Sequence, residues 1–140
     1  MYVNGTKVQT VTVATAKEIS SIAFYGCTSI LEVKITGPVT TINNRAFYGC
    51  TSLKSISFSS SLSKINSSAF AGCTSLNSIT FPTSLKEVGT NAFYNCSKLS
   101  VVNFNDGLTS VGSNAFENCS SLEKALLPSS LTVISDFLFR

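Results

Sequence analysis

Five cysteines have the widest chemistry in this sequence, because a thiol can bind a metal ion, form a disulfide or act as a nucleophile. They recur every 23 residues, as Cys27, Cys50, Cys73, Cys96 and Cys119. With no histidine in the sequence and no C-x-x-C pair, a zinc site is not indicated. The odd number and the apolar repeat position predict a ladder of buried free thiols, which suits a reducing compartment. Neighbouring rungs could come within disulfide distance, so oxidation stays open.

Catalytic side chains are sparse. Without histidine, the Ser–His and Cys–His pairs of nucleophilic catalysis cannot be built. The acidic residues share no repeat position that would bring two carboxylates together: Glu18, Glu32, Glu87, Asp106, Glu117, Glu123 and Asp136. No glycine-rich phosphate loop is present, and we expect Gly89 and Gly112, which share one repeat position, to be turn residues. We therefore predict a protein that is not an enzyme, with no cofactor and no metal.

The charge pattern excludes further classes. The net charge is +3, from 10 basic and 7 acidic residues, and no Lys/Arg block marks a nucleic-acid surface. No apolar run approaches the length of a membrane span, so we expect no membrane insertion. The opening residues lack a basic stretch followed by an apolar one, and we expect no signal peptide.

Apolar residues follow the same 23-residue step as the cysteines. The phenylalanines three positions before them are Phe24, Phe47, Phe70, Phe93 and Phe116, with Phe139 continuing the series. The complete unit reads L-x-x-I-x-F-x-x-x-L-x-x-I-x-x-x-A-F-x-x-C-x-x. The single domain 1–140 divides into a hairpin cap over 1–7, an irregular first repeat over 8–29, regular repeats and a truncated last repeat. The regular repeats are 30–52, 53–75, 76–98 and 99–121, and the truncated one is 122–140.

A fixed period of this kind predicts stacked units, each burying its inward face against the next. The alternation in Ile56-Ser57-Phe58 predicts a short strand, and neighbouring strands must be parallel because every unit repeats one path. The second segment, L-x-x-I, is either another brief strand or an extended turn. We expect A-F-x-x-C to form a tight helical or 3₁₀ turn, with little long helix. Asn4-Gly5 predicts the turn of the N-terminal hairpin.

Segments such as Ala46-Phe-Tyr-Gly-Cys-Thr-Ser-Leu53 and Ile79-Thr-Phe-Pro-Thr-Ser-Leu85 resemble the BspA-like leucine-rich repeats of bacterial surface proteins and protists. The resemblance covers roughly residues 8–139. It implies a leucine-rich-repeat β-solenoid whose strand-lined concave face serves protein binding or adhesion. The sequence departs from ordinary leucine-rich repeats because no regular asparagine follows the strand, so we expect no asparagine ladder.

The concave face is the predicted binding surface, and its outward strand positions carry mostly small polar residues. They are Glu32, Lys34, Ser55, Ser57, Ser78, Thr80, Val101, Asn103, Lys124 and Leu126. This set contains no aromatic residue and no arginine, the usual anchors of strong interfaces. The identity of a partner is therefore not indicated.

The last repeat carries apolar residues where earlier repeats are polar. Such a patch usually marks an interface, so we predict a homo-oligomer formed through this repeat, most simply by a two-fold end-to-end contact. The predicted self-association residues are Leu126, Val133, Phe137, Leu138 and Phe139. The alternative is that these residues face a further repeat of a longer array.

Two functional classes remain. One is an interaction or adhesion module at the cell surface or secreted, which the family resemblance implies. The other is an intracellular scaffold in the cytoplasm, which the five unpaired cysteines and the missing signal peptide favour.

Overall fold

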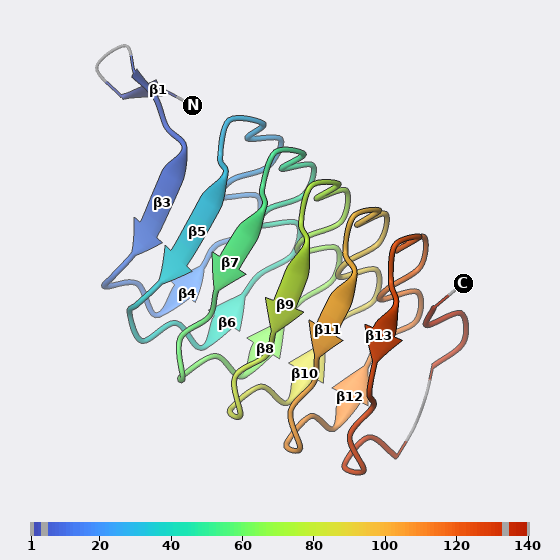
Figure 1. Cartoon of the computed structure of the whole chain (residues 1–140). Helices are drawn as coiled ribbons and strands as arrows, with labels where there is room; N and C mark the ends of the chain where they lie inside the picture. Colours follow the sequence, from blue (N-terminus) through green and yellow to red (C-terminus); the bar gives the residue numbers. More distant parts are fainter. Residues whose placement is uncertain (1, 4–5, 133–134, 140) are drawn as a thin grey trace.

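Five successive coils each carry two short strands in the same order, and the last coil carries one strand among the described residues (Figure 1). The computed structural model describes residues 2–3, 6–132 and 135–139. The first strands of successive coils are β3 (Thr10–Val13), β5 (Glu32–Ile35), β7 (Ser55–Ser57), β9 (Ser78–Thr80), β11 (Val101–Asn103) and β13 (Lys124–Ala125). The second strands are β4 (Glu18–Ile19), β6 (Thr41–Ile42), β8 (Lys64–Ile65), β10 (Glu87–Val88) and β12 (Ser110–Val111). The chain is a parallel β-solenoid, which confirms the predicted fold class.

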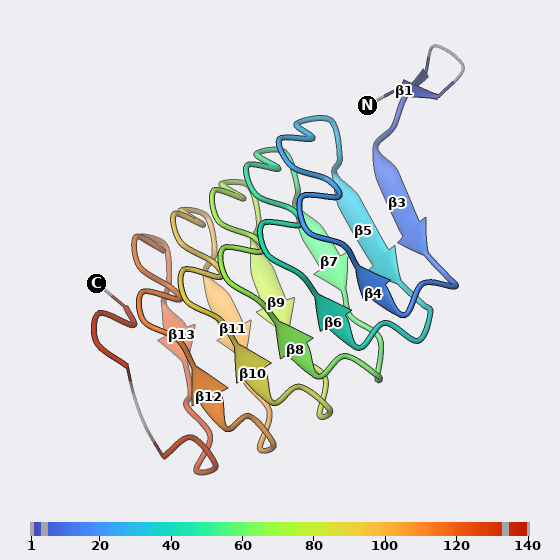
Figure 2. The same cartoon turned by 180° about the vertical axis from the view of Figure 1, so that it is seen from behind.

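The two sets of strands form opposite walls of the solenoid (Figure 2). The second strands make one parallel sheet in the order β12-β10-β8-β6-β4. The first strands make two three-stranded sheets, β3-β5-β7 and β13-β11-β9. Before β3, the strands β1 (Tyr2–Val3) and β2 (Thr6–Lys7) pair antiparallel, and the predicted turn residues 4–5 lie outside the described residues.

The register of the strands follows the repeat. Partners in neighbouring coils are 23 positions apart, as in Glu32↔Ser55, except that Thr10 faces Glu32 at 22 positions. Glu18 faces Thr41 at 23 again, so the residue missing from the first repeat is lost between β3 and β4. Like columns therefore lie over like columns from the first coil onward.

The A-F-x-x-C segment is not helical, which corrects the expected helical or 3₁₀ turn. Some amides do bond back three residues, as from Tyr48 to the Arg45 carbonyl and from Cys50 to the Phe47 carbonyl, both at 3.2 Å. The intervening amides point to the next coil, and Phe47 donates to the Ala69 carbonyl at 2.8 Å. The segment thus combines turns within a coil with hydrogen bonds between coils.

Left-handed residues make this alternation possible, because a positive φ ends a helical path. One left-handed position in each turn holds glycine or asparagine, the residues that accept it most readily: Gly26, Gly49, Gly72, Asn95 and Asn118. The other position is more varied: Ile22, Arg45, Ser68, Asn91, Asn114 and Phe137. None of the described residues lies in a helix, and accordingly no described segment is a helix long and apolar enough to cross a membrane.

The core is built from stacked columns of one residue type. The rings from Phe24 to Phe116 stack in series, with centroids 4.9–5.3 Å apart and planes within 6°. Phe47, Phe70 and Phe93 are fully buried. Aromatic pairs add about 0.5–1.5 kcal/mol each to the stabilisation from burial, so the phenylalanine column is a major source of cohesion between coils.

Candidate functional site

The predicted binding residues lie together on one wall, which we call the first-strand face: the outward side chains of β5, β7, β9, β11 and β13 with Leu126. Eight of the ten are exposed, and Glu32 and Val101 are half-buried. A side-chain hydrogen bond joins two coils there, because Asn103 Nδ2 donates to Thr80 Oγ1 at 3.1 Å. The alternation of the strands thus presents these residues to solvent while the intervening ones pack in the core.

The charge of the first-strand face lies at its two ends. On β5, the Lys34 ammonium and the Glu32 carboxylate are 3.3 Å apart, with side chains 50% and 38% exposed. On β13, Lys124 is exposed. The outward residues of β7, β9 and β11 between them are uncharged. The middle of the face is therefore a polar surface built from hydroxyl and amide groups together with Val101.

The parallel pairing of this face is interrupted at its centre. β5 pairs with β7, and β9 with β11, but β7 and β9 belong to separate sheets. The same two coils remain joined elsewhere, because β8 pairs with β10 and Phe70 donates to the Ala92 carbonyl at 2.8 Å. The two coils are thus held together along two sides, and on this third side the Asn77 amide still donates to the Lys54 carbonyl at 3.3 Å, directly before β7 and β9.

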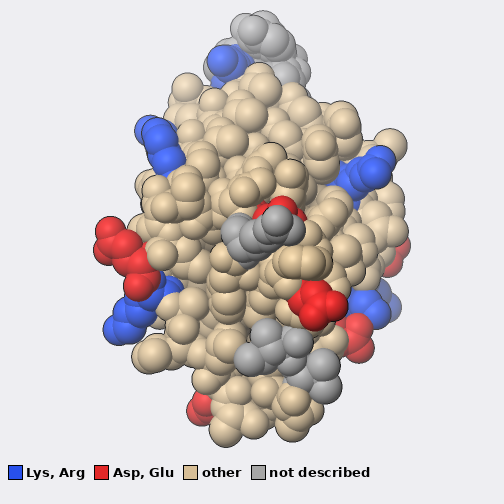
Figure 3. Space-filling model, turned by 90° about the vertical axis from the view of Figure 1, so that its right-hand side faces the viewer, with Lys and Arg blue, Asp and Glu red and all other residues tan. Residues whose placement is uncertain are grey.

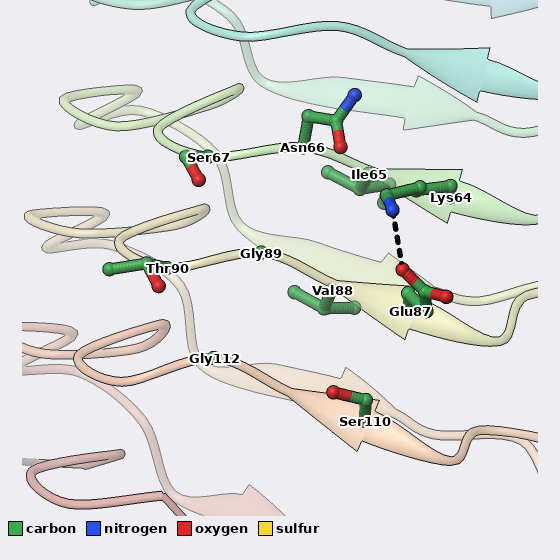
Figure 4. A pocket seen from close by; sticks show the side chains of 10 residues that line it. All are labelled: Lys64, Ile65, Asn66, Ser67, Glu87, Val88, Gly89, Thr90, Ser110 and Gly112. Carbon is green, nitrogen blue, oxygen red and sulfur yellow. Dashed lines mark ion pairs between the residues drawn. The ribbon is translucent and has the colours of Figure 1, made fainter.

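A hollow lies on the opposite wall, between β8, β10 and β12 (Figure 4). It has a volume of about 290 Å³. At its edge, Lys64 Nζ lies 2.6 Å from a Glu87 carboxylate oxygen, with both side chains about half exposed. Asn66, Ser67 and Thr90 supply the polar groups beside this ion pair. These residues offer hydrogen-bonding groups to a polar ligand, and the ion pair already neutralises the charge.

A change of residue type within one repeat column creates this hollow. In the earlier coils Asn66 Nδ2 donates to Asn43 Oδ1 at 3.1 Å, and Asn43 Nδ2 donates to Glu18 Oε2 at 3.2 Å. Two asparagines are therefore linked after the second strands, a different position from the one after the first strand where no asparagine ladder is expected. The column then carries Gly89 and Gly112, and the side-chain ladder stops.

The two glycines are not left-handed turn residues, which corrects their predicted role. A Cβ atom on Gly112 would lie 2.4 Å from the Thr90 amide nitrogen, and one on Gly89 would lie 2.7 Å from the Ser67 nitrogen. Glycine is needed here because the backbones of successive coils come into close contact. The change from Asn66 to Gly89 and Gly112 in one repeat column is the sequence signal that indicates the hollow. The residues that line the hollow were not predicted from the sequence.

The cysteines form the expected ladder of free thiols along the core. Each thiol from Cys50 onward donates to the phenylalanine carbonyl 26 residues earlier, as Cys73 does to Phe47 at 3.2 Å. Burial, with a smaller contribution from the neighbouring Cys27 thiol, raises the pKa of Cys50 from 9.0 to about 12. Burial also raises the pKa of Cys119 to about 11 and that of Cys73 and Cys96 well above 9.0. A raised pKa suppresses the reactive thiolate, so these thiols are structural.

The acidic residues stay dispersed. Within residues 2–3, 6–132 and 135–139, no three His, Cys, Asp or Glu side chains gather in a way that could hold a metal ion. Two tyrosines add a further exposed feature, because Tyr25 and Tyr48 stack with centroids 5.0 Å apart at 52% and 37% exposure.

The predicted self-association residues of the last coil differ in how much of each side chain is exposed. Leu126, Phe137 and Phe139 are 72%, 56% and 42% exposed. Leu138 is only 3% exposed and packs in the core, so it is removed from the predicted contact set as a correction. Val133 lies outside the described residues. Seen towards this end of the solenoid, lysine and arginine lie at the margins, and acidic residues lie nearer the centre among uncharged ones (Figure 3).

Three solved structures share this architecture. A leucine-rich repeat protein from T. pallidum is 35% identical with a TM-score of 0.72, and the match covers 86% of this chain and 52% of that one. A leucine-rich repeat protein from Bacteroides ovatus is 29% identical with a TM-score of 0.67, over 84% of this chain and 37% of that one. A leucine rich cell surface protein from Faecalibacterium prausnitzii is 29% identical with a TM-score of 0.68, over 86% and 39%. The chain thus spans about half or less of the length of these proteins.

No curated protein matches the chain significantly. The model of the BspA type leucine rich repeat region matches residues 17–140 in six copies. The chain therefore belongs to the BspA type leucine-rich repeat family.

Proposed function

We propose that this chain is a protein-binding module with an adhesive role, and that the first-strand face is its contact surface. The observation that carries the proposal is the face itself, where exposed small polar side chains follow one another over successive coils. Short hydroxyl side chains lose little conformational entropy on contact, so such a wall suits an extended interface. The family and the fold favour protein binding over catalysis.

A cell-surface location for this chain is supported by one relative, which is described as a leucine rich cell surface protein. An intracellular scaffold is the second candidate, because the five cysteines are free. Labelling of intact cells with a reagent that does not cross the membrane separates the two. A labelled protein supports the adhesive role, and an unlabelled protein with reduced thiols supports the scaffold.

The contact surface can be tested with two single substitutions. Asn103→Glu puts a charge on β11 of the first-strand face, and Ser110→Glu puts the same charge on an exposed residue of β12 on the opposite wall. Immobilised wild-type chain and both variants are compared for the proteins they retain from cell-surface and secreted fractions, with unfolded chain as the background. We expect Ser110→Glu to retain the wild-type set and Asn103→Glu to lose it. Retention of one set by all three chains, or of nothing above background, would refute the proposal.

We further propose self-association through the last coil, most simply a two-fold contact involving Leu126, Phe137 and Phe139. Their exposure supports this contact, because such apolar patches usually mark interfaces. Phe137→Asn removes the apolar ring at a left-handed position that asparagine also occupies in the preceding coils. We expect light scattering to show a lower mass than wild type, whereas Ile22→Asn at the same position of the first coil leaves the mass unchanged. A Phe137→Asn variant with wild-type mass would contradict the contact.

A further inference from the structure

The interruption between β7 and β9 opens a hollow in the middle of the first-strand face. Its volume is about 390 Å³, at the lower end of the range of pockets that hold small ligands, roughly 300–1,000 Å³. Hydroxyl groups form its rim, contributed by Ser55 and Ser57 on one strand and by Ser78 and Thr80 on the other. No charged side chain is among the residues that line it.

The floor of the hollow is apolar and belongs to the core. Ile56 occupies the same repeat column as Val33, Ile79 and Val102, which are 0%, 1% and 2% exposed, yet Ile56 is only half-buried. The Ile56 side chain points inward from β7, as expected from the alternation of exposed and less exposed residues along this strand. Ile56 on β7 is therefore accessible from the surface, whereas Ile79 on the facing strand β9 is buried.

Two phenylalanine rings complete the floor. Phe58 and Phe81 lie 6.1 Å apart with planes inclined by 29°, whereas the rings of Phe47 and Phe70 in the interior stack at 5.1 Å and 4°. The splayed pair has looser contact than the interior stack, and Phe58 is half-buried. An apolar group inserted here would replace water against Ile56 and Phe58, at about 25 cal/mol per Å² of apolar surface removed from water.

We propose that this hollow is the anchor subsite of the first-strand face and that it receives a tyrosine side chain of the bound protein. This rests on the proposed protein-binding function. A ring fits the apolar floor of Ile56, Phe58 and Phe81, and a phenolic hydroxyl can donate to and accept from the serine and threonine hydroxyls at the rim. A charged side chain would lose hydration without finding a counter-charge among the lining residues. Tyrosine is also a side chain enriched at the centres of protein interfaces.

The first test uses N-acetyl-L-tyrosinamide as the probe and the Ile56 δ1 methyl NMR signal as the reporter. We expect this signal to shift and to saturate at about millimolar probe, as for a small ligand of this size. The Ile19 methyl, on β4 of the opposite wall and 4% exposed, should stay unchanged. N-acetyl-L-lysinamide and methyl glucoside should leave both signals in place. No shift with the tyrosine probe, or an equal shift with the lysine or sugar probe, would overturn the proposal.

The second test closes the hollow. Ser57→Trp places a large side chain at the rim, and Lys17→Trp is the control, because Lys17 is exposed directly before β4 on the opposite wall. We expect Ser57→Trp to weaken probe binding and to reduce the retained protein at least about tenfold, and Lys17→Trp to preserve both. If Ser57→Trp abolishes probe binding but the protein set is still retained, the hollow is not the anchor. If the wild-type chain binds the probe but retains no protein, the proposed function fails instead.

Discussion

Two kinds of glycine in this solenoid should respond to alanine in measurably different ways. Gly72 has a φ of +75°, and a Cβ there would meet its nearest atom, the Gly49 Cα, at 3.6 Å, which is ordinary contact. Gly112 has no such φ, but its Cβ would lie 2.4 Å from the Thr90 backbone nitrogen. The first position needs glycine for its backbone conformation, and the second needs it for the close approach of two coils.

The expected magnitudes follow from these two causes. An L-residue in the left-handed region costs about 1–2 kcal/mol, and alanine recovers about 0.4–1 kcal/mol through the unfolded chain. Gly72→Ala should therefore lower the free energy of unfolding by about 1 kcal/mol. Gly72→Asn should cost less, because asparagine already occupies this repeat position at Asn95 and Asn118. Gly112→Ala must push two backbones apart and should cost about 3 kcal/mol or more.

Urea denaturation followed by far-ultraviolet circular dichroism measures all three variants against wild type. The predicted order of loss is Gly112→Ala, then Gly72→Ala, then Gly72→Asn. Equal losses for the two substitutions of Gly72 would show that φ is not the cause. A loss at Gly112 no larger than that at Gly72 would show that the coils are not in close contact there.

Three further predictions concern the core. Phe70→Ala should lower the free energy of unfolding by about 3–5 kcal/mol in urea denaturation, because the side chain is fully buried. Phe139→Ala should lower it clearly less, because Phe139 is 42% exposed. Equal losses for the two variants would contradict the stacked core. The free energy of unfolding should be level near neutral pH and fall as pH rises above 9.0. Above that pH the thiols of the unfolded chain lose protons, whereas the folded thiols keep theirs because their pKa is raised. Each such thiol lowers the free energy of unfolding by about 1.4 kcal/mol per pH unit. The double variant Cys73→Ala/Cys96→Ala should lessen that slope by about two thiols, and an unchanged slope would remove the thiols as its cause. Pulsed alkylation with mass spectrometry should modify the half-buried Cys27 before Cys73 and Cys96, and simultaneous modification of all three would argue against a buried ladder.

Much of the fold is predictable from the residue columns alone. Phe47, Phe70 and Phe93 recur at one spacing, and a column of large apolar residues has no place but the interior of a stack. The same period requires parallel strands, and the one-residue deficit between β3 and β4 can be located from the columns on either side.

The turn conformations were predicted less well, although the sequence carried a signal for them. Gly72 and Asn95 share one repeat position, and the left-handed region is what these two residue types have in common. Reading this column for its backbone conformation would have replaced the expected helical turn.

The hollow between β7 and β9 had no comparable signal. Ser55-Ile56-Ser57 and Ser78-Ile79-Thr80 have nearly the same residues, yet Ile56 is half-buried and Ile79 is 1% exposed. Ile56 borders the hollow between the two strands, whereas Ile79 does not line it. Sequence columns therefore predicted which residues face outward but not where the face opens.

A crystal structure of the chain tests like-on-like stacking most directly. We expect the rings of Phe47, Phe70 and Phe93 to lie inside the solenoid, parallel and about 5 Å apart, with one ring contributed by each coil. Rings turned towards solvent, or coils offset so that phenylalanine no longer meets phenylalanine, would contradict it.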